Sequence, residues 1–192
     1  MFKYLSGKIV IALLLGLASF AAAESSINIS YDYYDIEGRT ADELRQQMNI
    51  HGVLWTNANI YDAFTAWDVK WQYQYQVTEE GCVISAVTTT LKVEFRLPRW
   101  VNYSDGPAAL QQKWDVYMQS LRQHENGHKK IGMKAAADIE QSIAALKPAR
   151  TCDELAETAN ELGRHILSRY AEKEKAYDAQ TNFGETHGAI FP

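Results

Sequence analysis

The sequence predicts an α+β protein in which antiparallel strands fill the N-terminal half and two long helices follow. Two observations lead to this prediction. Apolar and polar residues alternate with a period of two in three runs between residues 27 and 97. From residue 110 onward, apolar residues instead recur every three or four positions, which is the period of a helix with one buried face.

The three strand runs differ in length and in how they end. The first covers 27–33, the second 67–77 and the third 87–97. The turn-like segment 78–81 separates the last two, which we expect to form a long antiparallel hairpin with one buried face. Pro98 is expected to end the third strand, because it has no N–H to donate.

The helices are predicted from their caps and from the apolar stripe. A short helix should start at Thr40 in a capping box with Glu43, and residues 49–63 are expected to be loop. Pro107 suits the first turn of a long helix, with Ser104 or Asp105 as its cap. A stripe of core-facing residues then runs as far as Lys147-Pro148: Leu110, Trp114, Tyr117, Leu121, His124, His128, Ile131, Ala135, Ile139, Ile143 and Leu146. A second helix is expected from Thr151 to about residue 175 or 178.

The first 23 residues have the pattern of a secretory signal peptide. Lys3 and Lys8 precede an apolar run over 9–20, and three alanines at 21–23 follow it. The run is too short to span roughly 30 Å of hydrocarbon. We therefore expect cleavage after Ala23, a single domain over 24–192, no membrane span after cleavage, and a location in the periplasm or outside the cell.

Charge and cysteine content narrow the function further. The chain carries 19 Lys+Arg against 24 Asp+Glu, a net charge of −5 that becomes more negative once Lys3 and Lys8 are removed. Nucleic-acid binding needs concentrated positive charge, so a nucleic-acid partner is not expected. Cys82 and Cys152 are the only cysteines, and an oxidising compartment favours a disulfide between them over two free buried thiols.

The chemically informative motif is His124-Glu125-Asn126-Gly127-His128. On a helix, histidines at i and i+4 project from the same face and can bind one zinc ion. Glu125 lies about 100° around the helix, where it can act as general base on water that the zinc activates. Two core histidines without a metal are the alternative. Gly127 favours the metal site, because close approach of another group would explain a costly mid-helix glycine.

A catalytic zinc needs a third protein ligand. If the two long helices turn near Ala149, counting along them places Glu174 level with His124. His187, in the turn-rich tail after the second helix, is a competing ligand that could fold back over the site. We expect His187 before Glu174 as the third ligand, and Tyr177 near the tail as a side chain that could stabilise an oxyanion.

The chain resembles an exported bacterial family, the domain of unknown function 922, which is regarded as a family of zinc peptidases with an HExxH motif. The resemblance covers nearly the whole chain after Ala23. It is carried by 34–38 with 43–44, by 66–67, Cys82, 97–100, 124–128 and Cys152, and by the tail 177–181. One position departs from the family pattern, because Phe183-Gly184 stands where a His-Gly pair is expected and the nearest such pair is His187-Gly188. The resemblance implies a zincin-like arrangement.

These observations predict a zinc-dependent metallopeptidase that binds one zinc and hydrolyses peptide or protein substrates in the cell envelope or outside the cell. An extended peptide could be held at the edge of the strand hairpin. The rival prediction is a non-catalytic envelope protein with an inert or structural zinc, for which His124, His128, Glu174 and His187 could supply four ligands. A zinc amidase acting on cell-wall material is a third possibility.

Overall fold

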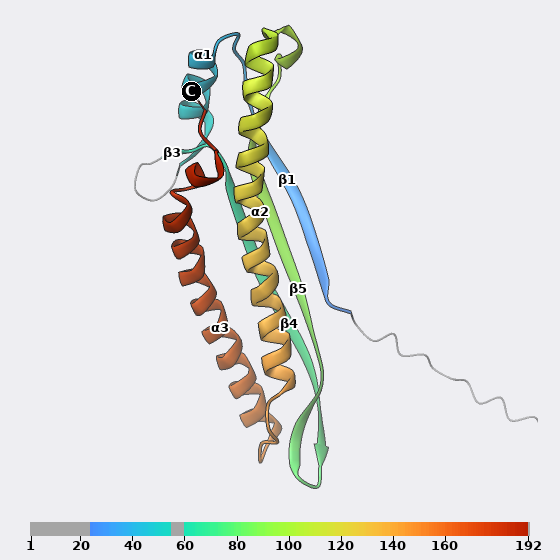
Figure 1. Ribbon diagram of the computed structural model, residues 1–192. Coiled ribbons are helices and arrows are strands. Elements are labelled where there is room, and N and C mark those ends of the chain that lie inside the picture. The colour runs from blue at the N-terminus through green and yellow to red at the C-terminus, as the bar shows by residue number, and fades with distance from the viewer. Residues whose placement is uncertain (1–23, 55–59, 192) are drawn as a thin grey trace, which may run out of the picture.

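The computed structural model describes residues 24–54 and 60–191, and the predicted signal peptide lies outside this part of the chain. The elements follow one another as β1 (Ser26–Ile36), α1 (Ala41–His51), β2 (Val53–Leu54), β3 (Ile60–Tyr61), β4 (Phe64–Thr78), β5 (Gly81–Trp100), α2 (Ala108–Ala144) and α3 (Cys152–Thr181). Strands first and helices second confirm the α+β prediction. The long helices α2 and α3 run side by side along the sheet, and α1 lies at one end of the molecule (Figure 1).

The main sheet has the strand order β1-β5-β4. The predicted β4–β5 hairpin is confirmed as antiparallel, with Trp67 opposite Val93 and Val69 opposite Leu91. β1 pairs with β5 in parallel, so the sheet is mixed rather than wholly antiparallel. This follows from the connection: α1 and the β2–β3 pair return the chain to start β4, and the hairpin then inserts β5 between β4 and β1.

Two sequence expectations about the strands are wrong. Pro98 does not end β5, which continues to Trp100 with Pro98 opposite Tyr34. β4 pairs with β5 only as far as Arg96, so Pro98 lies where β5 has a neighbour on one side alone, and proline is tolerated there. The segment 49–63, expected as loop, contains the end of α1 and the short β2–β3 pair. Two-residue strands are too short to produce a recognisable alternation.

The helix caps are partly as predicted. Thr40 forms the expected capping box with Glu43, and Thr151 accepts the backbone N–H of Glu154 at 3.2 Å. Ser104 and Asp105 do not cap α2. They lie in a separate 3₁₀ turn, η1 (Tyr103–Asp105), and the N-cap position belongs to Pro107. α3 extends to Thr181, three residues beyond the later of the two expected ends, 175 and 178.

The core lies between the sheet and the two long helices. It consists of the inward faces of β4, β5, α2 and α3 together with residues of β1 and α1, and its fully buried members include Ile36, Leu44, Leu91, Val93, Leu97, Tyr117, Ile139, Ile143 and Ile166. Each buried Leu or Ile contributes about 1.5–3 kcal/mol relative to an exposed position. This apolar layer holds α2 and α3 at fixed positions over the sheet.

A disulfide ties the sheet to the start of α3. Cys82 in β5 and Cys152 in α3 are bonded, with Cα atoms 5.1 Å apart, which confirms the predicted pairing. Next to it, Cys82 and Ala149 exchange two backbone hydrogen bonds of 2.8 and 2.9 Å. The β4–β5 hairpin is therefore joined to the α2–α3 connection and to the first turn of α3.

Candidate metal centre

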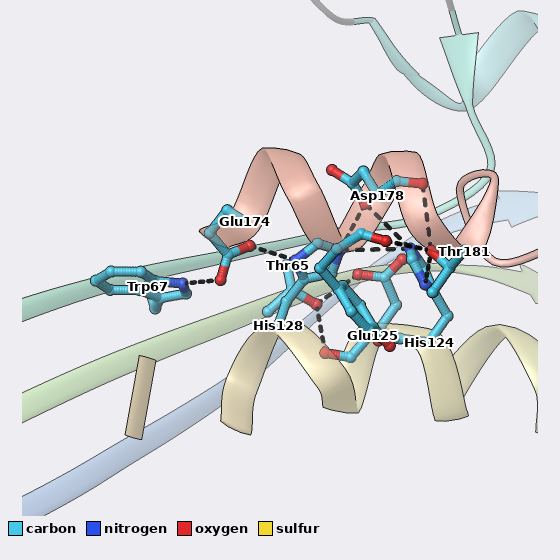
Figure 2. A network of polar contacts seen from close by, with 9 residues as sticks. Thr65, Trp67, His124, Glu125, His128, Glu174, Asp178 and Thr181 are labelled. Atoms are coloured by element: carbon cyan, nitrogen blue, oxygen red, sulfur yellow. Dashed lines mark hydrogen bonds and ion pairs between the residues drawn. The ribbon is translucent and has the colours of Figure 1, made fainter. Parts of the chain in front are cut away.

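The middle of α2 presents the three side chains of the HExxH motif to the interior. His124, Glu125 and His128 are each at most 7% exposed, which is unusual for charged or polar side chains unless they are paired. They point toward α3 and β4, as Figure 2 shows. The helical spacing predicted from the sequence therefore places both imidazoles on one buried face.

Asp178 of α3 completes a group of three side chains that could hold a metal ion. Nε2 of His128 lies 3.3 Å from Nε2 of His124, and Oδ1 of Asp178 lies 3.0 and 3.4 Å from these two nitrogens. For a tetrahedral zinc with bonds of about 2.0–2.1 Å, ligand atoms stand about 3.3 Å apart. The triangle of donors thus has the dimensions that a zinc ion requires, and two imidazoles with one carboxylate suit its chemistry.

Glu174 lies behind His128 rather than in the triangle. One of its carboxylate oxygens pairs with Nδ1 of His128, and the other accepts the indole N–H of Trp67 at 2.7 Å (Figure 2). Because a carboxylate accepts, it fixes the His128 proton on Nδ1 and leaves Nε2 as a lone-pair donor toward the triangle. Glu174 is therefore placed to orient His128.

His124 is oriented by the end of α3. The hydroxyl of Thr181 donates to the backbone carbonyl of Tyr177 at 2.8 Å and lies 3.4 Å from Nδ1 of His124. Since its single proton is used for Tyr177, the hydroxyl can accept the Nδ1–H of His124. That arrangement again leaves Nε2 free to bind a metal.

The ring of Tyr177 packs against both α2 and His124. It stacks on the His124 ring with centroids 5.1 Å apart, and its hydroxyl donates to the His124 carbonyl at 3.1 Å. A Cβ at Gly127 would lie only 2.0 Å from the Tyr177 oxygen, so the glycine allows this approach. The mid-helix glycine is thereby explained, and the tyrosine hydroxyl is committed to the backbone of α2.

Glu125 is held by β4. The hydroxyl of Thr65 donates to the Glu125 carboxylate at 2.6 Å, and both side chains are buried. Burial raises the pKa of the Glu125 carboxyl, and the Thr65 hydrogen bond opposes the rise. A carboxylate with a raised pKa is a better base near neutral pH than an ordinary one.

The electrostatics of the triangle favour a bound positive charge. Burial disfavours the charged form of His128, but hydrogen bonds to Asp178 and Glu174 outweigh it and raise the pKa of His128 to about 10. Burial alone would raise the pKa of Asp178, yet its bonds to the two imidazoles hold that pKa at about 2. Without a metal, this site keeps a proton at neutral pH, and a divalent cation would take the place of that charge.

A cavity of about 820 Å³ opens beside the triangle. Its wall includes all three donors together with Glu125 and Thr65. The volume lies in the range typical of ligand sites, roughly 300–1,000 Å³. The candidate metal centre is therefore buried on one side and accessible from the cavity on the other.

The structure places the remaining predicted residues outside the triangle. The ring of His187 is 5.9 Å from that of His124, and His187 is not among the three side chains that converge. It belongs to a 3₁₀ turn, η2 (Glu185–His187), and its Nδ1 is buried with no hydrogen-bond partner in the described part of the chain. Tyr177 is not part of the cavity wall.

Sequence reasoning missed Asp178 because it misplaced α3 by one turn. Turning the helices at Ala149 put Glu174 level with His124, whereas Glu174 contacts His128 and Asp178 contacts His124. A shift of four residues is about 6 Å along a helix. Asp178 follows Glu174 at i+4 on the same face, and it lies in the tail 177–181 that carried the family resemblance.

The fold and the donor set define an α+β protein with a candidate three-residue metal centre between two long helices and a sheet. The chain belongs to the family described as "Bacterial protein of unknown function (DUF922)", whose model matches residues 31–188. No curated protein and no solved structure matches the chain. Among the described residues, no helix is both long enough and apolar enough to cross a membrane.

Proposed function

We propose that this protein is an exported, zincin-like metallopeptidase that binds one zinc ion through His124, His128 and Asp178 and uses Glu125 as general base. The observation that carries the proposal is the triangle of donor atoms, 3.0–3.4 Å apart, beside a buried glutamate. Export is supported by the signal-peptide pattern of the first 23 residues and by the Cys82–Cys152 disulfide.

The residues around the triangle have separate roles in the proposed hydrolysis. Zinc, when bound, would supply Lewis acidity toward the substrate carbonyl and the attacking water. Glu125 takes the proton from that water and can deliver it to the leaving amine. Thr65 holds the carboxylate of Glu125 in place, so the base is oriented before substrate arrives. Tyr177 has no part in this proposal, since its hydroxyl already donates to the His124 carbonyl.

The edge of the sheet supports a peptide as substrate. Within the described residues, β4 is an outer strand that pairs with β5 alone, and its residues Thr65 and Trp67 belong to the cavity wall. An extended peptide could add to this edge as a further strand, with its backbone beside the triangle. The number of donors argues against a purely structural zinc. A structural site is closed by four protein ligands, whereas three donors converge here among the described residues, and they line an open cavity.

The test compares zinc-loaded wild type with Glu125→Gln on a mixture of unstructured peptides, with new termini identified by mass spectrometry. We expect cleavage by the wild type and a loss of at least 100-fold in Glu125→Gln, which should still bind one zinc. Glu172→Gln is the matched control, because this exposed α3 carboxylate pairs with Lys175 and is not part of the cavity wall. Equal cleavage by wild type and Glu125→Gln would overturn the assigned mechanism. A zinc-loaded wild type that cleaves nothing would overturn the peptidase proposal.

A further inference from the structure

Phe183, just after α3, has a backbone conformation that is rare for a bulky residue, in a turn where its N–H donates to the Asp178 carbonyl at 2.9 Å. Asn182 and Phe183 have φ angles of 47° and 52°, both in the left-handed region. Asparagine is common there at the end of a helix, but a bulky residue such as phenylalanine is rarely found with positive φ. Phe183 is nonetheless 50% exposed, so this strain is not offset by burial of its side chain. Strained residues of this kind cluster at functional sites.

The strained segment lies against the metal centre. The next residue, Gly184, has φ of 92° and approaches His124 so closely that a Cβ there would stand 3.0 Å from its Cγ. Phe183 directly precedes Gly184, so it lies next to the backbone that contacts His124, a proposed zinc ligand. Phe183 also forms part of the cavity wall. Its ring packs on Tyr61 of β3, with centroids 5.2 Å apart.

The same cavity wall carries other exposed apolar side chains. Ile60 is 43% exposed and Ile190 is 64% exposed, and together with Tyr61 and Phe183 they line the cavity. Exposed apolar side chains that gather at a cavity indicate a binding surface for an apolar group.

The charges of this wall are mostly negative. Five of its residues are acidic, namely Asp62, Glu125, Glu174, Asp178 and Glu185, and two are basic, Arg45 and Lys175. Arg45 is paired with Asp62 at 2.7 Å, and Lys175 with Glu172 at 2.8 Å. Even with a bound Zn²⁺, the four other acidic residues leave this wall with a surplus of negative charge, which disfavours an acidic substrate side chain.

We propose that Phe183 and Tyr61 form a subsite for a large apolar side chain adjoining the scissile bond, and that this subsite excludes acidic side chains. The inference rests on the proposed metallopeptidase function and adds the substrate class to it: extended peptides with an aromatic or branched aliphatic residue at the cleaved position. The left-handed backbone of Phe183 keeps its ring open to the cavity for this contact.

The test measures binding without requiring turnover. The probes are the N-acetyl hydroxamates of phenylalanine, glycine and aspartate, which bind zinc through the hydroxamate and differ only in side chain. Calorimetry with zinc-loaded protein gives the three dissociation constants for wild type, Phe183→Ser and Phe183→Leu. Val116→Ser is the control, because Val116 is 60% exposed on α2 and is not part of the cavity wall.

We expect the phenylalanine probe to bind wild type at least tenfold more tightly than the glycine probe, and the aspartate probe to bind most weakly. Phe183→Ser should lose most of the phenylalanine preference, Phe183→Leu should retain part of it, and Val116→Ser all of it. Equal binding of the three probes to wild type, or an unchanged preference in Phe183→Ser, would overturn the subsite. If none of the three probes binds zinc-loaded wild type, the zinc has no open position for a ligand, and the proposed peptidase function fails together with the subsite.

Discussion

Replacing Glu174 by glutamine should weaken zinc binding without abolishing it. Both oxygens of the Glu174 carboxylate accept hydrogen bonds, one from Trp67 and one from His128. Glutamine has a single acceptor oxygen, so one of the two donors would face an NH₂ group. Loss of such an outer partner of a metal-binding histidine typically costs 10- to 100-fold in metal affinity, or about 1.4–2.7 kcal/mol.

Competition with a chromophoric chelator at pH 7.5 measures this difference directly. Glu172→Gln is the matched control, since it removes the same charge two residues away on α3, at a carboxylate that pairs with Lys175. Its affinity should equal that of the wild type. If Glu174→Gln binds no zinc, Glu174 is a ligand and the assigned triangle is wrong. If its affinity is unchanged, His128 is oriented by something other than Glu174.

Three further predictions concern stability. Gly127→Ala should destabilise the protein although alanine favours helix by about 1 kcal/mol, because its Cβ would stand 2.0 Å from the Tyr177 oxygen. In a Tyr177→Ala background the same change should stabilise, and urea unfolding that shows no such reversal would contradict the packing. In the metal-free protein, the contribution of His128 to stability should be complete below about pH 6.5 and be lost as the pH rises toward 10, because folding raises the pKa of His128 from 6.5 to about 10. Thermal unfolding in EDTA between pH 6 and 10 measures this effect, and a flat profile would exclude the His128 pairing. Reducing Cys82–Cys152, which are 70 residues apart, should cost about 4 kcal/mol of unfolding free energy, and a loss below about 1 kcal/mol would show that the bridge constrains little.

Periodicity was sufficient to predict the main elements of this fold. The alternation in 67–77 and 87–97 predicted the β4–β5 hairpin, and the stripe from Leu110 predicted α2 with both histidines on its buried face. These features are local, because side-chain period follows directly from backbone geometry. The parallel pairing of β1 with β5 is not local, since it depends on where α1 and the β2–β3 pair return the chain.

In the candidate metal centre, too, some residues could be predicted from local spacing and others depend on tertiary packing. His124, Glu125 and His128 belong to one helix, so their spacing alone predicts a shared site. The third donor comes from α3, and its identity depends on how far one helix is displaced along the other. That displacement is a result of tertiary packing, in which the Cys82–Cys152 bond and the Cys82–Ala149 backbone pair join the sheet to the start of α3, and it cannot be derived from helix length. An error of one turn exchanges Asp178 for Glu174.

The outer partners of the site follow from tertiary packing as well. Thr65 and Trp67 lie in β4, and their spacing predicts a strand but does not predict which side chains they contact. Their contacts with Glu125 and Glu174 exist because β4 passes beside α2 and α3 at this level. Close approach by another group was the expected reason for Gly127, but the sequence did not identify Tyr177 as that group.

Zinc content of the purified protein tests the central claim most directly. Elemental analysis after expression with zinc should give about one zinc per chain for the wild type and for His187→Ala, and none for His124→Ala or Asp178→Ala. His187→Ala is the informative control, because His187 lies near His124 but outside the triangle. A wild type without zinc would contradict the metal centre. Zinc that is lost in His187→Ala and kept in Asp178→Ala would contradict the assignment of Asp178 as the third ligand.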